Sequence, residues 1–358
     1  MRLSSVEVIP YTLPFRRPYV TARGVLRGRE MVLLRVRDED GVVGLGEAVP
    51  LSLRGGVGLS EVVRELEEWA EDQALEIKGL SAPARCAVTV ARMDLLGRRA
   101  VEQGGGKDEA VPCNATLVAG DPEAVAADAE AWVADGFGTF KLKLGAESAS
   151  VPRIGVLTRT RASQDVEMVR AVREALGPEV RIRVDANQAW DLETAKATLT
   201  ALEPYGIELA EQPVGTLREM AELAQATSIP LATDESVASL DEAEEAAALG
   251  ACAYTGIKLS KVGGPEGALR IADVLPAYLT SALDGPVGIA AGAQTALSLA
   301  ETGHPERLHL AHGLATQRLF AATIASVECK VRDGMLHLPP GPGLGVEIDE
   351  EALQAHRI

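Results

Sequence analysis

Charged side chains recur at the ends of short apolar stretches in the middle of the chain. Lys141 and Lys143 lie two residues apart in one of these stretches. Residues i and i+2 of a strand face the same side, so the two ammonium groups would repel each other and lose hydration if buried. Both effects lower the pKa of a lysine, which suits it to accept a proton near neutral pH. The pair could instead form the solvated face of an edge strand. The residues downstream favour the interpretation in which a lysine accepts a proton.

Three later apolar stretches end in an acid, at Asp185, Glu211 and Asp234, and the next one ends near Lys258. If each stretch is a parallel strand of one barrel, the three carboxylates meet at the same rim. Carboxylates that converge in a half-enclosed site repel each other unless a divalent cation lies among them. Ligands that are all oxygen favour Mg²⁺, with Mn²⁺ as the alternative. Each acid alone could cap a helix or pair at the surface, but three at matching positions predict a shared metal ion.

The elements that must position these residues form a repeat. From residue 111 onward, short apolar stretches alternate with segments of helical periodicity. Eight strands with seven helices between them fit a β/α barrel, whose active site lies at the carboxyl ends of the strands. An open doubly wound sheet fits less well, because no Gly-x-Gly-x-x-Gly follows a strand. The predicted strands are 113–118, 139–144, 180–185, 208–211, 230–234, 256–259, 279–283 and 308–311.

The first 110 residues have a different pattern. Strands are predicted at 6–13, 31–37 and 42–47, with a hairpin turn between the last two, and helices follow at 60–74, capped by Ser60, and 82–102. We therefore expect an α+β domain at 1–110 and the barrel at 111–324. The tail 325–358 should fold back onto the first domain. The segment 146–164 is long for a connection between a strand and a helix, and the sequence leaves its role open.

The composition of the chain limits which classes of partner it can bind and in which cellular compartment we expect it. The net charge of −17 argues against a nucleic acid or an anionic membrane as partner, but a local lysine cluster can still attract a small carboxylate. The four cysteines are far apart and fit reduced thiols better than disulfides or a zinc site. Neither a signal peptide nor an apolar run long enough to span a membrane is evident. We expect a cytoplasmic globular protein, and a homo-oligomer is left open.

Five short motifs together resemble those of the enolase superfamily, in its muconate-lactonizing subgroup, and the resemblance extends over essentially the whole chain. The motifs are Lys141-x-Lys143, Asp185-Ala186-Asn187, Glu211-Gln212-Pro213, Asp234-Glu235-Ser236 and Lys258. The resemblance implies a (β/α)7β barrel with an N-terminal α+β capping domain.

By the same resemblance, Asp185, Glu211 and Asp234 bind Mg²⁺, while Lys143 and Lys258 flank the α-carbon of a carboxylate substrate. The implied chemistry is removal of the α-proton to give an enediolate. Lys141 and Asn187 would contact the substrate. Cap segments 19–24 and 49–53 would close the site.

Several members of this subgroup share that first step. The stretch from Thr280 to Gly288, with Ser281 and Asp284 as expected substrate contacts, resembles o-succinylbenzoate synthase, a dehydratase of menaquinone biosynthesis. Dipeptide epimerases usually carry acids at the end of the eighth strand, and this chain has none between His309 and Thr316. The sequence therefore favours dehydration of a cyclohexadiene carboxylate. N-acylamino acid racemase, dipeptide epimerase and muconate cycloisomerase are the alternatives, and a catalytically silent binding protein is a remote one.

Overall fold

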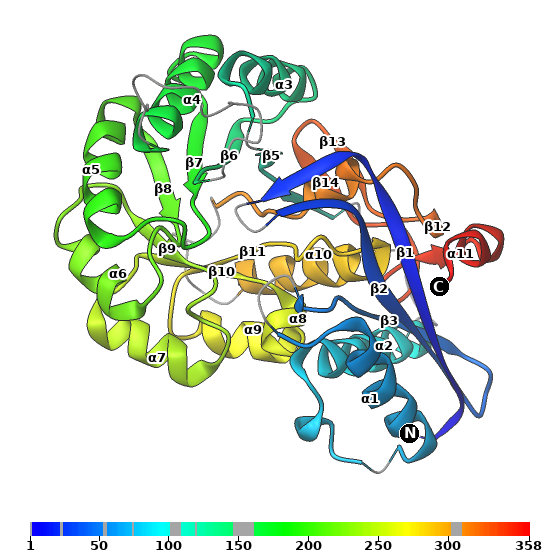
Figure 1. Ribbon diagram of the computed structural model, residues 1–358. Helices are drawn as coiled ribbons and strands as arrows, with labels where there is room; N and C mark the ends of the chain where they lie inside the picture. The colour runs from blue at the N-terminus through cyan, green and yellow to red at the C-terminus, as the bar shows by residue number, and fades with distance from the viewer. Residues whose placement is uncertain are drawn as a thin grey trace.

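The computed structural model describes residues 2–21, 24–52, 56–73, 75–100, 109–118, 120–145, 161–301 and 310–358. An antiparallel N-terminal sheet with two helices lies beside a parallel barrel that is ringed by helices (Figure 1). Most of the connection expected at 146–164, namely 146–160, lies outside the described residues, and so does the segment 101–108. Among the described helices, none is long and apolar enough to cross a membrane.

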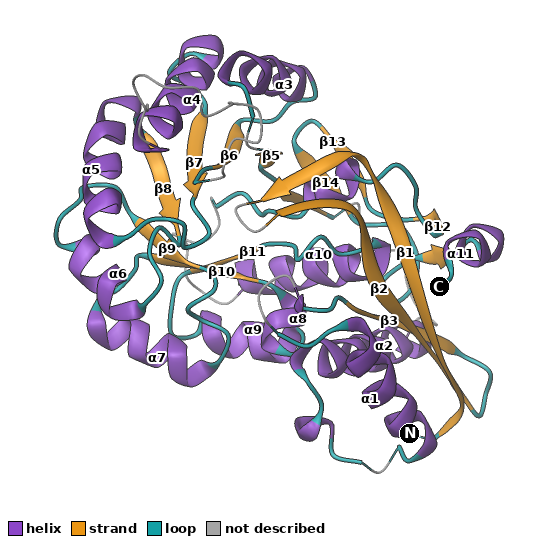
Figure 2. Ribbon diagram, viewed as in Figure 1, coloured by secondary structure: helices purple, strands orange, loops and turns teal. Residues whose placement is uncertain are grey.

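Three antiparallel strands form the N-terminal sheet. They are β1 (Leu3–Thr21), β2 (Gly24–Asp38) and β3 (Val43–Ala48). The carboxylate of Asp38 accepts hydrogen bonds from the backbone N–H groups of Asp40 and Val42, which fixes the β2–β3 turn. The predicted meander is therefore present, although β1 and β2 run further than expected, and the tip of their hairpin extends to the barrel (Figure 2).

Helices α1 (Leu59–Glu71) and α2 (Ala82–Ala100) cover one face of this sheet, and the opposite face packs on the core of the barrel. Helix α2 lies so close to β3 that a Cβ atom at Gly46 would be 2.0 Å from the carbonyl oxygen of Ala87. The expected N-cap at Ser60 is wrong, because α1 begins one residue earlier, after Gly58, and no side chain caps it. A 3₁₀ turn, η2 (Ile77–Gly79), joins the two helices.

Seven parallel strands form the barrel sheet in sequential order, with neighbours in the chain paired in space. The strands are β5 (Ala115–Leu117), β6 (Thr139–Lys143), β7 (Arg181–Asp185), β8 (Ile207–Glu211), β9 (Leu231–Thr233), β10 (Tyr254–Ile257) and β11 (Ala277–Leu279). The segment around His312 and Gly313 closes the barrel, since His312 pairs with Cys113 before β5 and Gly313 pairs with Thr280 after β11. The predicted (β/α)7β barrel with an N-terminal cap is confirmed.

Helices on the outside connect the strands and bury one face each against the sheet (Figure 2). Several begin at a capping side chain: Thr216 and Glu219 form a capping box at α6, and Asp191 caps α5. The outer helices are α3 (Pro122–Ala134), α4 (Arg161–Leu176), α5 (Leu192–Leu202), α6 (Leu217–Ala224), α7 (Leu240–Leu249), α9 (Pro265–Ala272) and α10 (Pro286–Glu301), with 3₁₀ turns η3 (Glu203–Tyr205) and η5 (Ala315–Leu319). The short helix α8 (Leu259–Val262) follows β10, and all four of its residues are buried.

The C-terminal tail contacts the N-terminal sheet. Its elements are β12 (Ala325–Val327), β13 (Lys330–Arg332), β14 (Met335–His337), β15 (Glu347–Ile348) and α11 (Glu350–His356), and β14 also pairs with β4 (Ala110–Pro112). The backbone N–H of Ile358 donates to the carbonyl of Pro10, and Arg357 pairs with Tyr11. The tail therefore ties the end of the chain to β1.

One predicted strand is wrong in a way that matters for the site. The stretch 279–283 was expected to be a strand, but β11 ends at Leu279 and the chain then turns. The carboxylate of Asp284 accepts from the hydroxyl of Ser281 at 2.6 Å and from the backbone N–H of Ala282 at 2.7 Å. Leu283 adopts a φ of 67°, which a strand does not allow. The polar side chains thus convert an apolar stretch into a turn at the mouth of the barrel.

Candidate active site

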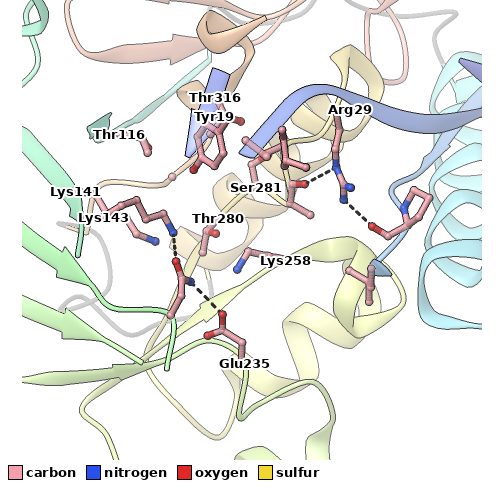
Figure 3. Close-up of a pocket in the computed structure, with 17 residues that line it drawn as sticks. Tyr19, Arg29, Thr116, Lys141, Lys143, Glu235, Lys258, Thr280, Ser281 and Thr316 are labelled. Carbon is pink, nitrogen blue, oxygen red and sulfur yellow. Dashed lines mark hydrogen bonds between the residues drawn. The ribbon is translucent and has the colours of Figure 1, made fainter. Parts of the chain in front are cut away.

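A cavity of about 110 Å³ lies between the N-terminal sheet and the carboxyl ends of the barrel strands (Figure 3). Its inner end is lined by the ammonium-bearing side chains of Lys141, Lys143 and Lys258. Its outer end has one wall from the cap and one wall from the turn after β11. The cap wall is formed by Tyr19, Leu26, Arg29, Pro50 and Leu51, and the barrel wall by Thr280, Ser281, Ala282 and Leu283.

The two lysines of β6 face the cavity from one side of the strand, as their spacing predicts. The ammonium nitrogen of Lys141 lies 2.8 Å from Oδ2 of Asp185 and 2.6 Å from Oε1 of Glu211. That of Lys143 lies 2.5 Å from Oδ2 of Asp185 and donates to Oδ1 of Asn187 at 3.0 Å. Asp185 therefore joins both lysines.

The pKa values of these lysines do not shift in the expected direction. Burial is the largest single effect and favours the neutral amines, but the combined charge of the surrounding groups, Asp185 foremost, outweighs it and raises the pKa of both Lys141 and Lys143. Glu211 adds to the effect on Lys141. The charge of Lys141 does lower the pKa of Lys143, as the sequence suggested, yet the contribution is smaller than that of Asp185. The expectation of a lowered pKa is therefore wrong for this arrangement, which holds both lysines protonated.

The three acids lie side by side, one at each of three consecutive strand ends. Asp185 ends β7, Glu211 ends β8 and Asp234 follows β9, and none is more than 1% exposed. Burial and the charge of Asp185 raise the pKa of Glu211, whereas burial is overcome at Asp185 by the two lysines of β6, which lower its pKa. The hydroxyl of Tyr278 donates to Oε2 of Glu211 at 2.6 Å from inside the barrel. The strand ends thus gather three interacting carboxylates.

Asp234 is held by two lysines, one of which the sequence interpretation missed. Lys258, directly after β10, forms an ion pair with Oδ2 of Asp234. Lys261, on α8, lies 3.0 Å from Oδ1 and also donates to the main-chain oxygen of Asp234. The signal was present as Lys258-x-x-Lys261, a spacing that puts two side chains on one side of a helical turn. The short helix α8 that produces this geometry was not predicted.

These carboxylates fit a hard divalent cation by the chemistry of their donors. All three residues offer carboxylate oxygens, which Mg²⁺ prefers, and their buried negative charge is compensated by ammonium groups. As the side chains stand, Lys141 lies between Asp185 and Glu211. In the described part of the chain, no three His, Cys, Asp or Glu side chains are grouped to hold an ion without rearrangement. The ammonium groups would therefore have to move away from the carboxylates for an ion to bind.

The expected substrate contacts divide into two groups. Asn187 and Ser281 line the cavity, and the amide nitrogen of Asn187 donates to Oε1 of Glu235 at 3.1 Å. Asp284 is not among the cavity-lining residues of the described chain, because its carboxylate turns back to the hydroxyl of Ser281. Asp284 therefore shapes the turn that carries Ser281. The hydroxyl of Ser281 is in turn committed to Asp284.

The sequence matches a known family over most of its length. The model of the family described as "Enolase C-terminal domain-like" matches residues 124–352. The chain belongs to the enolase superfamily. Muconate cycloisomerase 1 of Pseudomonas putida is similar to it, with 28% identity over 97% of this chain and 96% of that protein.

Two further superfamily members show the range of similar proteins. An o-succinylbenzoate synthase of Thermobifida fusca is 34% identical over 68% of this chain and 70% of that protein. The structure of a dipeptide epimerase from Cytophaga hutchinsonii, complexed with Mg and the dipeptide D-Ala-L-Val, superposes with a TM-score of 0.85 at 26% identity, covering 100% of this chain and 99% of that one. The superfamily members that this chain resembles therefore carry out different reactions.

Proposed function

We propose that this superfamily member is a metal-dependent enzyme that removes a proton from the carbon α to a carboxylate. The observation that carries the proposal is that Lys143 and Lys258, from strand ends on different parts of the barrel, both line the same cavity (Figure 3). A substrate held between them offers its α-carbon to an amine on each side. The three buried acids beside the lysines support a metal requirement.

In this proposal Asp185, Glu211 and Asp234 hold Mg²⁺, with Mn²⁺ as the alternative. When bound, the ion supplies positive charge that stabilises the enediolate oxygens and offsets the carboxylates that now hold the lysines. Lys143 accepts the α-proton at its Nζ atom. Lys141 keeps positive charge next to the substrate carboxylate, and Asn187 orients Lys143 through its Oδ1 atom. Tyr19 of β1 and Leu26 of β2, which line the outer end, exclude water from it.

For the overall reaction we propose dehydration, as in o-succinylbenzoate synthase. The relative with that activity has the highest sequence identity of the three proteins described above, 34%. The segment Leu310–Thr316 at the end of the barrel contains no acid to hold the ammonium group of a dipeptide. After Lys143 has taken the α-proton, it returns that proton to the departing hydroxide, and Lys258 remains protonated beside the intermediate.

Cycloisomerization is a second candidate, supported by a different observation. The muconate cycloisomerase relative matches this chain over 97% of its length, whereas the synthase matches over 68%. The same lysines and acids would serve, since a muconolactone also carries an acidic proton α to a carboxylate. N-acylamino acid racemization and dipeptide epimerization share the same first step.

The experiment is a substrate panel assayed with the purified protein and Mg²⁺. It contains the cyclohexadiene precursor of o-succinylbenzoate, muconolactone, N-succinylamino acids and dipeptides. We expect dehydration of the cyclohexadiene carboxylate to have the highest kcat/KM. Efficient turnover of another class without dehydration would contradict the synthase assignment, while leaving α-proton abstraction supported.

A further inference from the structure

The two walls at the outer end of the cavity come from distant parts of the chain. Leu51 belongs to the segment after β3, and Ala282 belongs to the turn after β11. Neither residue is in a helix or strand, so no ladder of backbone hydrogen bonds fixes the separation of the two walls. Any residue that sets this separation also sets the width of the cavity where the body of the substrate lies.

The hydrogen bonds within the turn after β11 hold its shape but do not fix its cavity wall relative to the cap. Within it, Asp284 accepts from Ser281 and from the N–H of Ala282, and the N–H of Asp284 donates back to the hydroxyl of Ser281 at 2.8 Å. These bonds maintain Leu283 at its positive φ. All of them lie between residues of the turn itself, so the link to the other wall must come from elsewhere.

Arg29, on β2, makes that link. Its Nη2 donates to the carbonyl of Pro50 at 2.6 Å, and its Nε donates to the carbonyl of Ala282 at 3.2 Å (Figure 3). The side chain lines the cavity and is only 6% exposed. A guanidinium group is planar and rigid, so two of its nitrogens hold their acceptors at a fixed distance. One side chain therefore spans the two walls.

The far end of the same turn is anchored by a different residue of the cap. The carboxylate of Glu47, on β3, accepts from the N–H of Gly285 at 2.7 Å and from the hydroxyl of Tyr11 at 2.8 Å. A Cβ atom at Gly285 would lie 2.2 Å from that hydroxyl, which explains a glycine at this position. Glu47 thus secures the turn away from the cavity, whereas Arg29 secures the part that forms the cavity wall.

We propose that Arg29 is a positioning residue that fixes the separation of the Pro50–Leu51 wall from the Ser281–Leu283 wall, and thereby determines which substrate bodies the cavity binds. The inference deepens the α-proton abstraction proposed above and rests on it for its kinetic consequences. It assigns selectivity to a cap residue that acts through carbonyl groups on both sides of the cavity and need not touch the reacting atoms.

A matched control exists elsewhere in the barrel. Arg173, on α4, also donates to loop carbonyls, those of Tyr205 at 2.9 Å, Gly177 at 2.9 Å and Val180 at 2.8 Å. These acceptors precede β7 and β8, at the amino ends of the strands and so away from the cavity. Arg173→Lys makes the same chemical change as Arg29→Lys without altering the walls.

The kinetic test compares wild type, Arg29→Lys and Arg173→Lys on the best substrate of the panel. Lysine keeps the charge but cannot hold two carbonyls in a fixed plane. We expect Arg29→Lys to raise KM by about tenfold and to change kcat by less than about threefold, because binding of the substrate body is lost equally in the ground and transition states. Arg173→Lys should change neither. An unchanged KM for Arg29→Lys, or an equal rise in the control, would overturn the proposal.

A second measurement does not depend on activity. Hydrogen exchange followed by mass spectrometry should show faster exchange in peptides 279–286 and 49–52 of Arg29→Lys, and wild-type rates in both peptides of Arg173→Lys. If wild type acts on no carboxylate of the panel, the proposed function fails and this exchange measurement alone decides on Arg29. Should Arg29→Lys not fold, Arg29→Gln takes its place, and failure of both to fold would show a purely structural role and reject the proposal.

Discussion

The inner and outer ends of the cavity are built differently. At the inner end, side chains from consecutive strand ends meet in an ionic cluster, where Lys141 lies 2.6 Å from Glu211 and Asp185 is fully buried. At the outer end, two loops are joined by the guanidinium group of Arg29, which donates to the main-chain carbonyls of Pro50 and Ala282. A repeating barrel can thus keep one set of reactive groups in place while its loops and its cap vary, which agrees with the different reactions of its relatives.

The change with the largest expected effect removes the proposed base at the inner end. Lys143→Ala should lower α-proton exchange by at least about a thousandfold, because general bases contribute effects of that order. The measurement is loss of the α-proton signal of the substrate in D₂O by NMR. Lys196→Ala, at a partly exposed lysine on α5 that pairs with Glu222, is the control and should be unaffected. If the α-proton exchange rate of Lys143→Ala stays within about tenfold of the wild-type rate, Lys143 is not the base, and the inner end of the cavity loses the role that distinguishes it from the outer end.

The second change removes a proposed metal ligand. Asp234→Asn should weaken Mg²⁺ binding by at least about a hundredfold, as measured by calorimetry. It should also lower the free energy of unfolding by about 3 kcal/mol, because Lys258 and Lys261 both pair with this carboxylate. Asp191→Asn serves as the control, because Asp191 is exposed at the N-terminus of α5 and an asparagine side chain can still cap that helix. Wild-type Mg²⁺ affinity in Asp234→Asn would contradict the metal assignment.

The third change tests the role of Lys258. In the proposed dehydration this residue supplies a fixed charge, whereas in a racemization it must transfer a proton. Lys258→Arg keeps the charge but cannot give up a proton near neutral pH. We expect it to retain measurable dehydration, at a rate at least about tenfold above that of Lys258→Ala, and to abolish any racemization of N-succinylamino acids. Equal activities of the Arg and Ala variants in the dehydration assay would show that charge at this position does not matter.

The change with the smallest effect per step concerns the hydrogen bonds by which Glu47 anchors the turn after β11. Burial and the nearby charge of Asp284 raise the pKa of Glu47 to about 8. Tyr11 from β1 and Cys86 from α2 also face this carboxyl group. Because the folded state holds the proton more tightly than the unfolded state, the stabilisation is complete below the ordinary pKa of 4.5 and is lost as pH rises to about 8.

The free energy of unfolding should therefore fall by about 1 kcal/mol per pH unit across this window through Glu47 alone. Denaturant unfolding at pH 5, 6, 7 and 8 measures the slope, and Glu47→Gln removes the titration. Wild type should lose more stability than the variant as pH rises. If the free energy of unfolding falls with pH equally in wild type and Glu47→Gln, Glu47 is ionised throughout, and its anchoring of the turn does not depend on pH.

The contrast between the two ends also explains what could be predicted from the sequence. Asp185, Glu211 and Asp234 each end an apolar stretch, so one residue per repeat was enough to place them together. The barrel itself follows from the same periodicity. Lys261 was missed because it depends on α8, a helix of a single turn that periodicity does not detect. The direction of the lysine pKa shifts was wrong because it depends on distances to Asp185, which no spacing reveals.

At the outer end, contacts between distant segments decide the geometry. Arg29 and Ala282 are joined across 253 positions, and no local pattern indicates such a pair. Asp284 was expected to contact the substrate, but a carboxylate three residues after a serine can equally close a turn, as it does here. Residue type alone does not separate these two roles. The structure of the turn was needed to assign Asp284 to the support of Ser281.

The most direct test of the central claim is the exchange of substrate α-protons with solvent by the wild-type protein. The cyclohexadiene precursor of o-succinylbenzoate and N-succinylamino acids are incubated with the protein in D₂O, once with Mg²⁺ and once with excess EDTA, and followed by NMR. The account predicts turnover or α-deuteration of at least one carboxylate with Mg²⁺ and none with EDTA. Reaction that persists undiminished in EDTA, or no α-proton removal from any carboxylate of the wider panel with Mg²⁺, would contradict it.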